Sequence, residues 1–506
     1  MHVPCRSAGV LVFYDAALYD SPIPIQVGHR FFVKLSPVIT IVAAGIAVVV
    51  VGLAALLLIH PPLPLLTQVA LNQTSIAPGD DRSDSSALIR YTLNRPAPVT
   101  ISFQSKANGQ VYTFRDHLMR MPGDYQVNFS GVVDGYHLPG ETAESLGGEV
   151  LARLIPAGVY QWKVEADNPD GSAINQQGDL AITPVDAALP AIQDFSISPL
   201  VFTPNQDGID DRVAINVYLA KAATLSVYLQ SADGVRYDMP ERIEGRQPGE
   251  KGAHIFDYDG GVDNKVTPPP NGLYTVIAES QDAAGQIVRR TGQLTIRDSG
   301  LPQAEIQPQT SGGIVTYGTQ PFTGQQTVSA PAGVTAIQST VQMMQGDLLS
   351  FRTTVYNYGT TPIRTLGPWP GTVYQDNQLD GAFLNGTPYV RSGAWRIGFE
   401  CETSDTNFPW RWAIGSPDEL TKVTDAQGHD YYYLMPGKSA TVWGGIVMKQ
   451  LITSRNPKQC WAALIHEDVA IDPLQSTVGT VSVRLIATGS TSPSPANTTV
   501  SPTAVF

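Results

Sequence analysis

A short run of polar residues in the middle of the chain is the clearest candidate for binding chemistry. Residues 205–211 read Asn-Gln-Asp-Gly-Ile-Asp-Asp. Calcium loops begin with such an alternation, because carboxylate oxygens surround the ion and the glycine permits the turn. An EF-hand would also need a glutamate further on, and none is correctly placed. The same residue types form Asx turns ahead of a strand. The run therefore predicts either a turn or a calcium site made by Asn205, Asp207, Asp210 and Asp211, and no other cofactor is expected.

The C-terminal third holds a group of aromatic residues that could form a binding surface. Alternation places Trp410 and Trp412 on one face of a strand, and Tyr431, Tyr432 and Tyr433 follow in one run. Exposed planar rings bind sugar faces and peptides, which would suit a cell-envelope polymer, a glycan or a surface protein as the partner. A core strand shows the same alternation. Both interpretations, core and binding surface, stay open.

Signatures of enzymes are missing from the sequence. It contains no HExxH, CxxC or P-loop motif, and no GxSxG or GxGxxG motif in a strand–turn–helix context. The triplet His-Glu-Asp at 466–468 follows an alternating stretch and is interpreted as structural. A glycosidase needs two carboxylates at a fixed separation, and the candidates are Glu400, Asp405, Asp418 and Glu419. The sequence predicts a non-enzymatic protein, with a carbohydrate-binding or hydrolytic domain as the alternative.

Length and composition limit the class of protein. About 150 residues per domain give roughly three domains for a chain of 506 residues. Charged residues make up 15% of the chain, well below the ~25% of an average soluble domain. The net charge is −13, so the basic footprint that nucleic-acid binding needs is missing. We expect a protein that does not bind nucleic acid.

One apolar stretch near the N-terminus predicts a single-pass membrane anchor. Residues 35–59 contain no charged residue, and a helix of that length would span about 37 Å, enough for a ~30 Å hydrocarbon core. Arg30 and Lys34 precede the stretch, and the next basic residue after it is Arg82. The positive-inside rule then leaves residues 1–34 in the cytoplasm and the bulk of the chain outside. A cleaved signal peptide is the alternative, but the stretch is long for one and no clean Ala-x-Ala site follows.

If the chain beyond the anchor is exported, its cysteines can form a disulfide. Cys5 falls in the predicted cytoplasmic segment, whereas Cys401 and Cys460 would lie in an oxidising space where disulfides persist. We expect a disulfide between these two residues, which would contribute ~4 kcal/mol in the chain-entropy model. Two buried thiols are the alternative.

Two segments beyond the predicted anchor repeat each other. Matching pairs are Pro78 and Pro204, Leu93 and Leu219, Thr100 and Thr224, and Tyr160 and Tyr274. The interval between partners shortens along the chain, so the first copy carries extra residues. We assign these to 138–154 and expect them to add a short helix.

Strand signals dominate both copies. Apolar residues alternate in stretches such as 224–231, which is the period of a half-buried strand. Ala-Asn-Gly at 107–109 supplies the residues that a hairpin turn needs. The predicted fold class is mainly β, with tandem Ig-like antiparallel β-sandwiches after one N-terminal transmembrane helix. The modules would be residues 86–186 and 190–299, after a spacer at 60–85.

Two sequence elements of the second copy carry a family resemblance. Residues 271–285 read Asn-Gly-Leu-Tyr-x-Val-x-Ala-x-x-x-Asp-Ala-Ala-Gly, and residues 256–260 read Phe-Asp-Tyr-Asp-Gly. They resemble the immunoglobulin-like domain of the flagellar hook-capping (FlgD-type) family, with Tyr258 in place of that family's tryptophan. The matching stretch of the first copy, 128–131, lacks the aspartate. The resemblance implies the fold only, because such modules serve as spacers, stalks and adhesion units.

Residues 305–489 form a third unit, which differs from the two repeats in composition. This unit holds six of the seven tryptophans, namely Trp369, Trp395, Trp410, Trp412, Trp443 and Trp461. Residues 355–363 and 433–446 resemble bacterial Ig-like domains of the adhesion-associated (CARDB-like) kind. The interval 364–430 predicts large loops or an insertion, and the Ser/Thr/Pro-rich tail 490–506 should be disordered. We expect a stalk of two modules that presents this unit, as a binding or structural domain, at the cell surface.

Overall fold

The computed structural model describes residues 37–58, 63–79, 84–170, 172–243, 245, 247–308, 313–333, 337–377, 383–384, 387–388 and 392–488. The chain divides into two compact units after Pro64. The predicted cytoplasmic segment 1–34, with Cys5, Arg30 and Lys34, and the predicted tail 490–506 lie outside the described residues.

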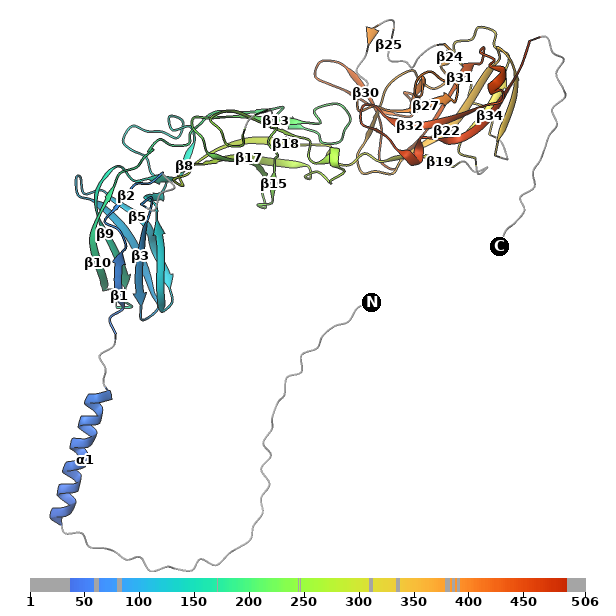
Figure 1. Cartoon of the computed structure of the whole chain (residues 1–506). Helices are drawn as coiled ribbons and strands as arrows, with labels where there is room; N and C mark the ends of the chain where they lie inside the picture. The colour runs from blue at the N-terminus through green and yellow to red at the C-terminus, as the bar shows by residue number, and fades with distance from the viewer. Residues whose placement is uncertain are drawn as a thin grey trace, which may run out of the picture. The chain divides into compact units, whose positions relative to one another are not determined.

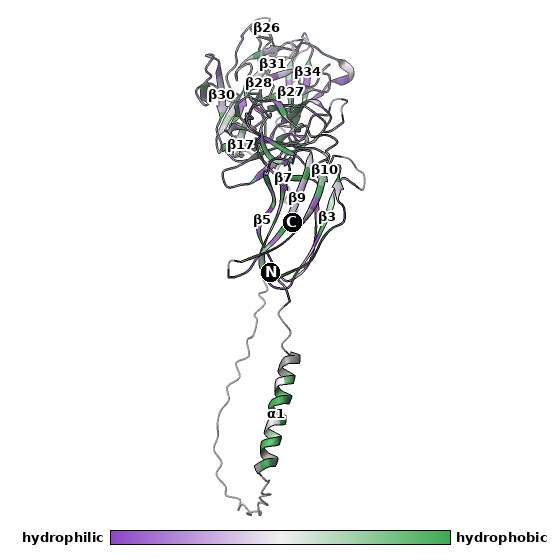
Figure 2. Cartoon of the chain, turned by 90° about the vertical axis from the view of Figure 1, so that its left-hand side faces the viewer, coloured by the Kyte–Doolittle hydropathy of each residue, from purple (hydrophilic) through white to green (hydrophobic). Residues whose placement is uncertain are grey.

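The first unit holds helix α1, Pro37–Leu58, whose 22 residues carry no charged side chain. Proline suits the first turn of a helix, because the N–H groups there have no intrahelical acceptor. Figure 2 shows most of α1 in the colour of hydrophobic residues. The membrane anchor is a prediction from the sequence alone. In the described part of the chain, no helix combines the length and the apolarity that a membrane crossing requires.

Module 1 is a sandwich of two β-sheets (Figure 1). The strand orders are β1–β3–β6 and β2–β10–β9–β4–β5. The strands are β1 Leu66–Leu71, β2 Ser75–Ile76, β3 Ala87–Leu93, β4 Ala97–Ser105, β5 Val111–Arg120, β6 Gly123–Phe129, β9 Gly158–Asp167 and β10 Ala173–Ile182. Alternating burial along β3 and β4 turns one face of each strand into the core, where the rings of Phe103 and Phe129 stack at 3.9 Å between centroids.

Module 2 has the same arrangement, with strand orders β11–β13–β16 and β15–β14–β17–β18. Its elements are β11 Ile192–Ser198, β12 Val201–Phe202, β13 Val213–Leu219, β14 Thr224–Gln230, β15 Arg236–Asp238, β16 Gly252–Tyr258, the short helix η1 Val262–Asn264, β17 Gly272–Gln281 and β18 Ile287–Ile296. In each module a short strand, β2 or β12, runs parallel to the last strand. The sandwiches are therefore not antiparallel throughout, because the chain crosses between sheets after its first strand and then runs alongside its last one.

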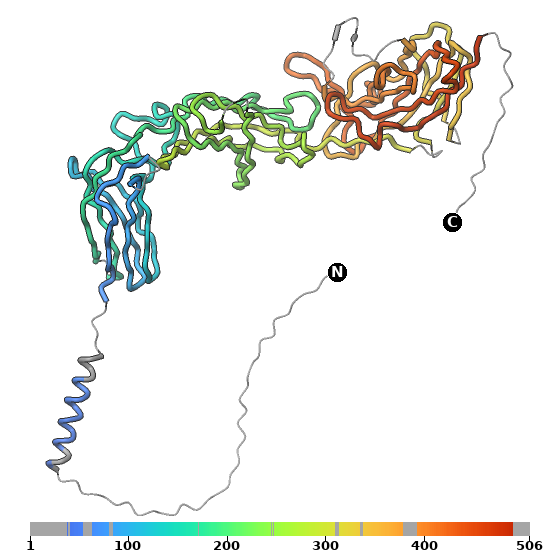
Figure 3. The backbone as a smooth tube through the Cα atoms, viewed as in Figure 1, coloured from blue at the N-terminus to red at the C-terminus, as the bar shows by residue number. Residues whose placement is uncertain are grey.

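Equivalent tyrosines of the two repeated modules make the same hydrogen bond. The Tyr160 and Tyr274 hydroxyls each donate to the carbonyl four residues earlier, at Pro156 and Pro270, and both distances are 2.7 Å. The predicted spacer 60–85 is wrong in part, because β1 and β2 lie within it (Figure 1). Figure 3 shows the backbone of this stretch, at the blue end of the colour bar, running alongside the other chain segments of module 1. The burial pattern of β1 shows one buried residue and five that are partly or fully exposed, so its strand signal in the sequence is weak.

The extra residues of the first copy form turns and a strand, not the short helix that we expected. Turns occupy 139–140 and 143–147, and β8, Glu149–Leu154, follows and pairs with β7, Val132–Asp134. β8 also pairs antiparallel with β18 of module 2, with Glu149 opposite Arg289 and Ala152 opposite Ile287 (Figure 1). The unpaired edge of β18 offers backbone partners that an isolated short helix would lack. A strand of module 1 thus extends the sheet of module 2.

Two glycines allow this close approach between the modules. A Cβ atom at Gly148 would lie 2.5 Å from the carbonyl oxygen of Arg289, and one at Gly147 would lie 2.8 Å from Cβ of Ala191. Both glycines have positive φ, of 144° and 75°, a conformation that other residues rarely adopt. The chain can turn into β8 at this place only because neither residue has a side chain.

Polar contacts, with Gln286 and Asp282 buried among them, complete the junction between the two modules. The side-chain amide nitrogen of Gln286 donates to the carbonyl oxygen of Ala188 at 2.9 Å, and its oxygen accepts from the backbone N–H of Leu154 at 3.2 Å. The Lys221 ammonium binds Asp186 at 2.7 Å and Asp282 at 2.9 Å. Buried polar groups need such partners, so the loss of one would leave Gln286 or Asp282 without a hydrogen bond that it makes here.

The C-terminal domain contains two larger sheets, β19–β22–β31–β24 with β20 on β22, and β21–β34–β32–β27–β23–β30–β29 with β28 on β27 and β33 on β32. Its elements are β19 Ala304–Gln307, β20 Thr316–Gln320, β21 Thr340–Met344, β22 Leu348–Asn357, β23 Ile363–Thr365, β24 Val373–Gln375, β25 Phe383–Leu384, β26 Thr387–Pro388, β27 Trp395–Cys401, β28 Trp410–Ala413, β29 Thr421–Thr424, β30 Asp430–Leu434, β31 Ser439–Val447, η2 Thr453–Arg455, β32 Lys458–His466, β33 Ala470–Ile471, η3 Pro473–Gln475 and β34 Val478–Ile486. The interval 364–430 that was expected to hold large loops contains short strands, and part of it lies outside the described residues.

We expect Gly148→Ala to destabilise the protein more than Gly140→Ala. Both glycines have positive φ, so both variants should lose roughly 1–2 kcal/mol to backbone strain. A Cβ at Gly140 meets nothing within 4 Å, whereas one at Gly148 meets the Arg289 carbonyl, which should cost a further ~1–3 kcal/mol of unfolding free energy. Urea unfolding, with hydrogen exchange of the β8 amides, measures the difference. Equal losses in the two variants would contradict the role of Gly148.

Candidate functional site

The run 205–211 joins module 2 to the C-terminal domain. We call residues 203–211 the junction loop, which makes up all but the last residue of the connection between β12 and β13. Asn205 and Asp207 of this loop are buried, although polar residues of connecting loops are normally solvated. Side chains of the C-terminal domain contact Asp207.

Arg364 of β23 is the central contact of the junction loop. This arginine is only 2% exposed. Its Nε donates to the backbone carbonyl of Asp207 at 2.5 Å, and its Nη2 donates to the carbonyl of Ser392. A Cβ atom at Gly208 would lie 2.0 Å from that Ser392 oxygen, so the loop reaches this position only with a glycine there. A buried guanidinium is costly unless its donors are satisfied, and backbone carbonyls satisfy it here.

Two further side chains of the C-terminal domain contact the junction loop. The Tyr433 hydroxyl donates to Asp207 Oδ2 at 3.0 Å. His466 Nε2 lies 2.7 Å from the carbonyl oxygen of Gln206, and its ring stacks on Trp395 at 4.4 Å. Burial lowers the pKa of His466 to about 4, although backbone hydrogen bonds partly oppose the shift. At neutral pH the ring is therefore uncharged and donates from Nε2 to the carbonyl oxygen.

Hydrogen bonds inside the junction loop are those of Asx turns. The side-chain oxygen of Asn205 accepts from the N–H of Asp207 at 3.0 Å, and Asp207 Oδ1 accepts from the N–H of Ile209 at 2.9 Å. The carboxylate of Asp211 accepts the N–H groups of Asp207 at 3.1 Å and of Gly208 at 2.5 Å. These are the bonds that the turn interpretation predicts. Among the described residues, no three His, Cys, Asp or Glu side chains are grouped to hold a metal ion.

Two carboxylates of the junction loop are electrostatically unfavourable in their ionised form. Burial raises the pKa of Asp211 to about 7, and the charge of Asp207 adds to the shift. Burial also raises the pKa of Asp207, against the opposing hydrogen bond from Ile209. Asp210, the fourth residue of the expected calcium set, is exposed. A raised carboxyl pKa gives stability that is complete below the unfolded value and is lost as the pH rises through the folded value.

Trp410 and Trp412 are core residues, so their assignment to a binding surface is wrong. They are 4% and 0% exposed. They lie on β28, opposite Phe399 and Ile397 of β27. Trp412 also meets Phe351 of the facing sheet edge-on, at 4.8 Å between centroids. The alternation in the sequence is that of a strand with one face in the core, because both indoles remove large apolar areas from water there.

Tyr431, Tyr432 and Tyr433 are half-buried on β30 and make three different contacts. Tyr433 reaches the junction loop. The Tyr431 hydroxyl donates to Asp425 at 3.2 Å, and Tyr432 meets the Trp369 ring edge-on at 5.0 Å. The three rings therefore do not form one flat platform. Tyr432 belongs to the expected aromatic surface and stays partly exposed, and its neighbour Trp369, which was not part of that prediction, is also partly exposed.

The carboxylates considered for glycoside hydrolysis are not arranged around a described cleft. Glu400 and Glu419 each accept one backbone N–H, at 2.8 Å and 2.9 Å. Asp405 and Asp418 are exposed. The structure places a cleft of about 690 Å³ in module 1, and none of the four lines it.

That cleft lies between β5 and the segment 133–139. Tyr112 and Tyr136 contribute rings at 5.1 Å, edge to face. Tyr112 is buried, and the guanidinium of Arg153 lies over the Tyr136 ring at 5.0 Å. The cleft therefore offers little open ring surface on which a sugar could stack.

The triplet 466–468 is structural, as the sequence interpretation had it. The carboxylate of Glu467 binds Arg396 at 3.2 Å and Arg411 at 2.6 Å. This cluster is nearly buried, and a buried carboxylate needs such cationic partners. His466 has a role that the sequence did not indicate, because its hydrogen-bond partner in the junction loop is 260 residues away.

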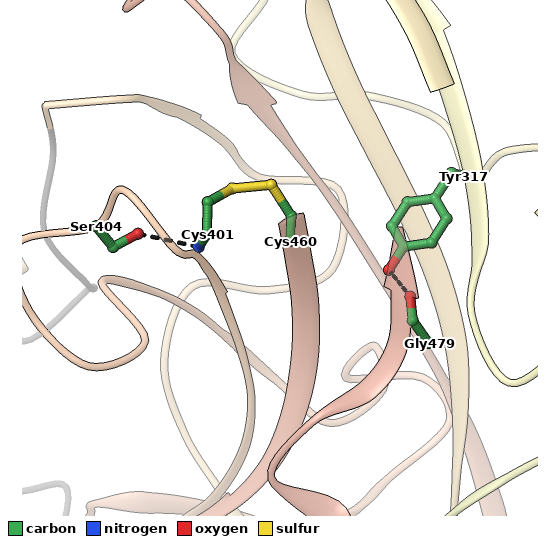
Figure 4. The surroundings of a disulfide bond; sticks show 5 residues. All are labelled: Tyr317, Cys401, Ser404, Cys460 and Gly479. Atoms are coloured by element: carbon green, nitrogen blue, oxygen red, sulfur yellow. Dashed lines mark hydrogen bonds between the residues drawn. A yellow bond between two sulfur atoms is a disulfide. The ribbon is translucent and has the colours of Figure 1, made fainter. Parts of the chain in front are cut away.

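Cys401 and Cys460 form the expected disulfide (Figure 4). They face each other on β27 and β32, directly opposite in the strand register. Both residues are buried in the core of the C-terminal domain. The backbone N–H of Cys401 also donates to Ser404 Oγ at 3.0 Å (Figure 4), so the bond adds a covalent link within a sheet that is already paired.

Arg364 is the contact residue that sequence reasoning missed. Its partner Asp207 is 157 residues earlier in the chain, so no local pattern could connect them. The available signal was weak, because the strand Ile363–Thr365 reads Ile-Arg-Thr and its complete burial appears only in the structure. An arginine in such a position needs a buried acceptor, but the sequence could not say which one.

Comparisons with known proteins give no family. No family model and no curated protein match the chain. Among solved structures, a Ca²⁺-stabilised adhesin of an Antarctic bacterium is 13% identical, with a TM-score of 0.19, over 75% of this chain and 73% of that one. A tetra-tandem repeat from the extending region of a large adhesion protein is 13% identical, with a TM-score of 0.15, over 80% and 97%. A 1.5-MDa bacterial ice-binding adhesin is 10% identical, with a TM-score of 0.17, over 76% and 98%. Scores this low do not establish a shared arrangement, and the function of this chain does not follow from them.

Removing the disulfide should lower stability without changing the fold. We expect the double variant Cys401→Ala/Cys460→Ala to lose ~2–4 kcal/mol of unfolding free energy, because the bond closes a long loop of the unfolded chain, between residues 59 apart. Urea unfolding of the oxidised parent and the variant measures the loss. Unchanged stability would show that the strand pairing alone fixes this loop.

Acid should weaken the contact between the junction loop and the C-terminal domain, because His466 becomes protonated. Its folded pKa of about 4 lies below the ordinary value of 6.5, so its contribution to stability is present above pH 6.5 and lost as the pH falls towards 4. His466→Gln keeps an N–H donor and should flatten this limb of the stability profile. The matched control, exposed His137→Gln, should leave it unchanged. Thermal unfolding of the full chain from pH 7 to pH 4 gives the comparison, and identical profiles for the parent and His466→Gln would contradict this role.

Proposed function

We propose that the chain is a non-enzymatic, single-pass membrane protein whose extracytoplasmic β domains present the C-terminal domain at the cell surface. The observation that supports this best is how the β domains are joined. β8 enters the sheet of module 2, and the junction loop is buried against Arg364 of the C-terminal domain. Freely moving domains share few such contacts. Domains joined in this way suit a stalk better than a flexible tether.

The proposed location rests on the N-terminal sequence and on the disulfide. Residues 35–59 would cross the cell membrane once, with 1–34 in the cytoplasm, as the flanking Arg30 and Lys34 indicate. A structural disulfide persists in an oxidising compartment, which fits an extracytoplasmic position for the C-terminal domain.

The C-terminal domain is the proposed contact with a partner, because it lies at the opposite end of the sequence from the anchor. A cell-envelope polymer, a glycan or a surface protein are the classes that suit such a position. The burial of Trp410 and Trp412 weakens the alternative of a carbohydrate-binding or hydrolytic domain. The half-buried pair Trp369 and Tyr432 is the remaining aromatic candidate for the contact.

The topology can be tested by labelling thiols on intact cells. In a Cys5→Ser background, an impermeant maleimide should label Ala232→Cys, which lies in an exposed turn of module 2. Ser7→Cys, in the predicted cytoplasmic segment, is the matched control and should react only after lysis. The disulfide cysteines do not react. Labelling of Ser7→Cys on intact cells, or protection of Ala232→Cys, would contradict the proposed orientation.

A further inference from the structure

The hairpin that joins β5 to β6 in module 1 ends in exposed apolar side chains. Leu118 is 39% exposed, and Met119 and Met121 are each 64% exposed. We call residues 118–122 the hairpin tip. Water-exposed methionines are flexible and apolar, and such side chains adapt to many contact surfaces. Their concentration within four residues points to a partner.

The fold does not require apolar residues at this place. Gly123 starts β6 opposite Leu93, and Gly252 starts β16 opposite Leu219 in the second copy. The residues before Gly252 are Pro-Gly-Glu-Lys, whereas those before Gly123 are Met-Arg-Met-Pro. Module 2 therefore forms the same strand pair behind a polar, charged turn. The strand pair therefore does not need apolar residues directly before its second strand, as module 1 has within 118–122.

Strand register shows which end of module 1 carries the hairpin tip. Leu66, at the start of the first strand, lies opposite Leu93, and Leu93 lies opposite Gly123. Ala97 lies opposite Arg120. The hairpin tip therefore lies at the end of the module where the chain arrives from the apolar segment 35–59.

The corresponding end of module 2, where its first strand begins, contacts the preceding module. Ile192, at the start of its first strand, lies opposite Leu219, and its N–H donates to the carbonyl oxygen of Gly147 of module 1 at 3.2 Å. In module 2 this end rests on the part of the protein that precedes it. In module 1, the predicted membrane anchor precedes it.

We propose that the hairpin tip contacts the outer surface of the lipid bilayer, an inference that rests on the proposed anchor. Only seven peptide steps separate Leu58, the last residue of α1, from Leu65, which limits the connection to about 25 Å. Leu118, Met119 and Met121 would enter the boundary between headgroups and acyl chains, where apolar side chains gain from leaving water. Exposed Arg95, in the neighbouring turn, has the charge to meet lipid phosphates.

The experiment uses the full chain in nanodiscs of phosphatidylcholine with one quarter phosphatidylglycerol, one chain per disc, in a Cys5→Ser background. An environment-sensitive dye is placed on Met121→Cys, or on the control Asn108→Cys in the exposed turn at the other end of β5. With a quencher on the lipid acyl chains, we expect several-fold stronger quenching and a blue-shifted emission at 121. A further variant, Met119→Asp with the dye at 121, should lose both effects.

Each outcome bears on the proposal. Equal quenching at 121 and 108 would overturn the contact with lipid while leaving the anchor intact, which co-flotation with vesicles reports independently. A chain that does not co-float would overturn the anchor and the contact together. Blue-shifted emission without lipid quenching, or a signal that appears only at several chains per disc, would assign the hairpin tip to another protein surface and overturn the lipid contact.

Discussion

The backbone pairing of β8 with β18 is the constraint on which the arrangement of the first two modules depends. The extra residues of module 1 include β8, and this strand is hydrogen-bonded to the sheet of module 2. The pairing requires Gly147 and Gly148, because Cβ atoms there would overlap the neighbouring chain. It also brings Gln286 into the buried space between the modules. A sheet shared by two modules resists bending at their junction, because bending would expose backbone groups without partners.

Module 2 and the C-terminal domain are joined by side-chain hydrogen bonds and not by strand pairing. Arg364, Tyr433 and His466 reach from the C-terminal domain to the backbone and side chain of the junction loop. Nearly all of these contacts are polar and buried, so their net stabilisation is small but the loss of one partner is costly. Such an interface favours a single geometry more than it favours high stability. It also carries titratable groups with opposite effects, since Asp211 favours low pH and His466 favours neutral pH.

Local patterns were enough to predict much of the fold. The alternation of apolar residues and the turn signals gave two β-sandwiches, and the repeat matched Tyr160 with Tyr274, whose hydrogen bonds are the same. The facing cysteines of β27 and β32 form the expected bond. The predictions from sequence failed where a segment pairs with a strand that is distant in the chain. β1 lies in a stretch whose proline, asparagine, serine and aspartate residues suggest a spacer, and only one of its own residues is buried. Part of the stretch expected to add a helix, 138–154, instead forms β8 because the edge of β18 pairs with it.

The period, the repeat and the apolar segment can be recognised without the structure, because each depends on neighbours within about a turn of a helix or a strand pair. The alternation in the sequence also limits Trp410 and Trp412 to one face of a strand. Only the tertiary structure decided that this face is the core, since burial depends on which sheet lies opposite. The same holds for the run 205–211, whose Asx turns follow from its composition, while its burial depends on Arg364, far away in the chain. Contacts over such separations arise from the meeting of complete sheets, and no local pattern of residues encodes them.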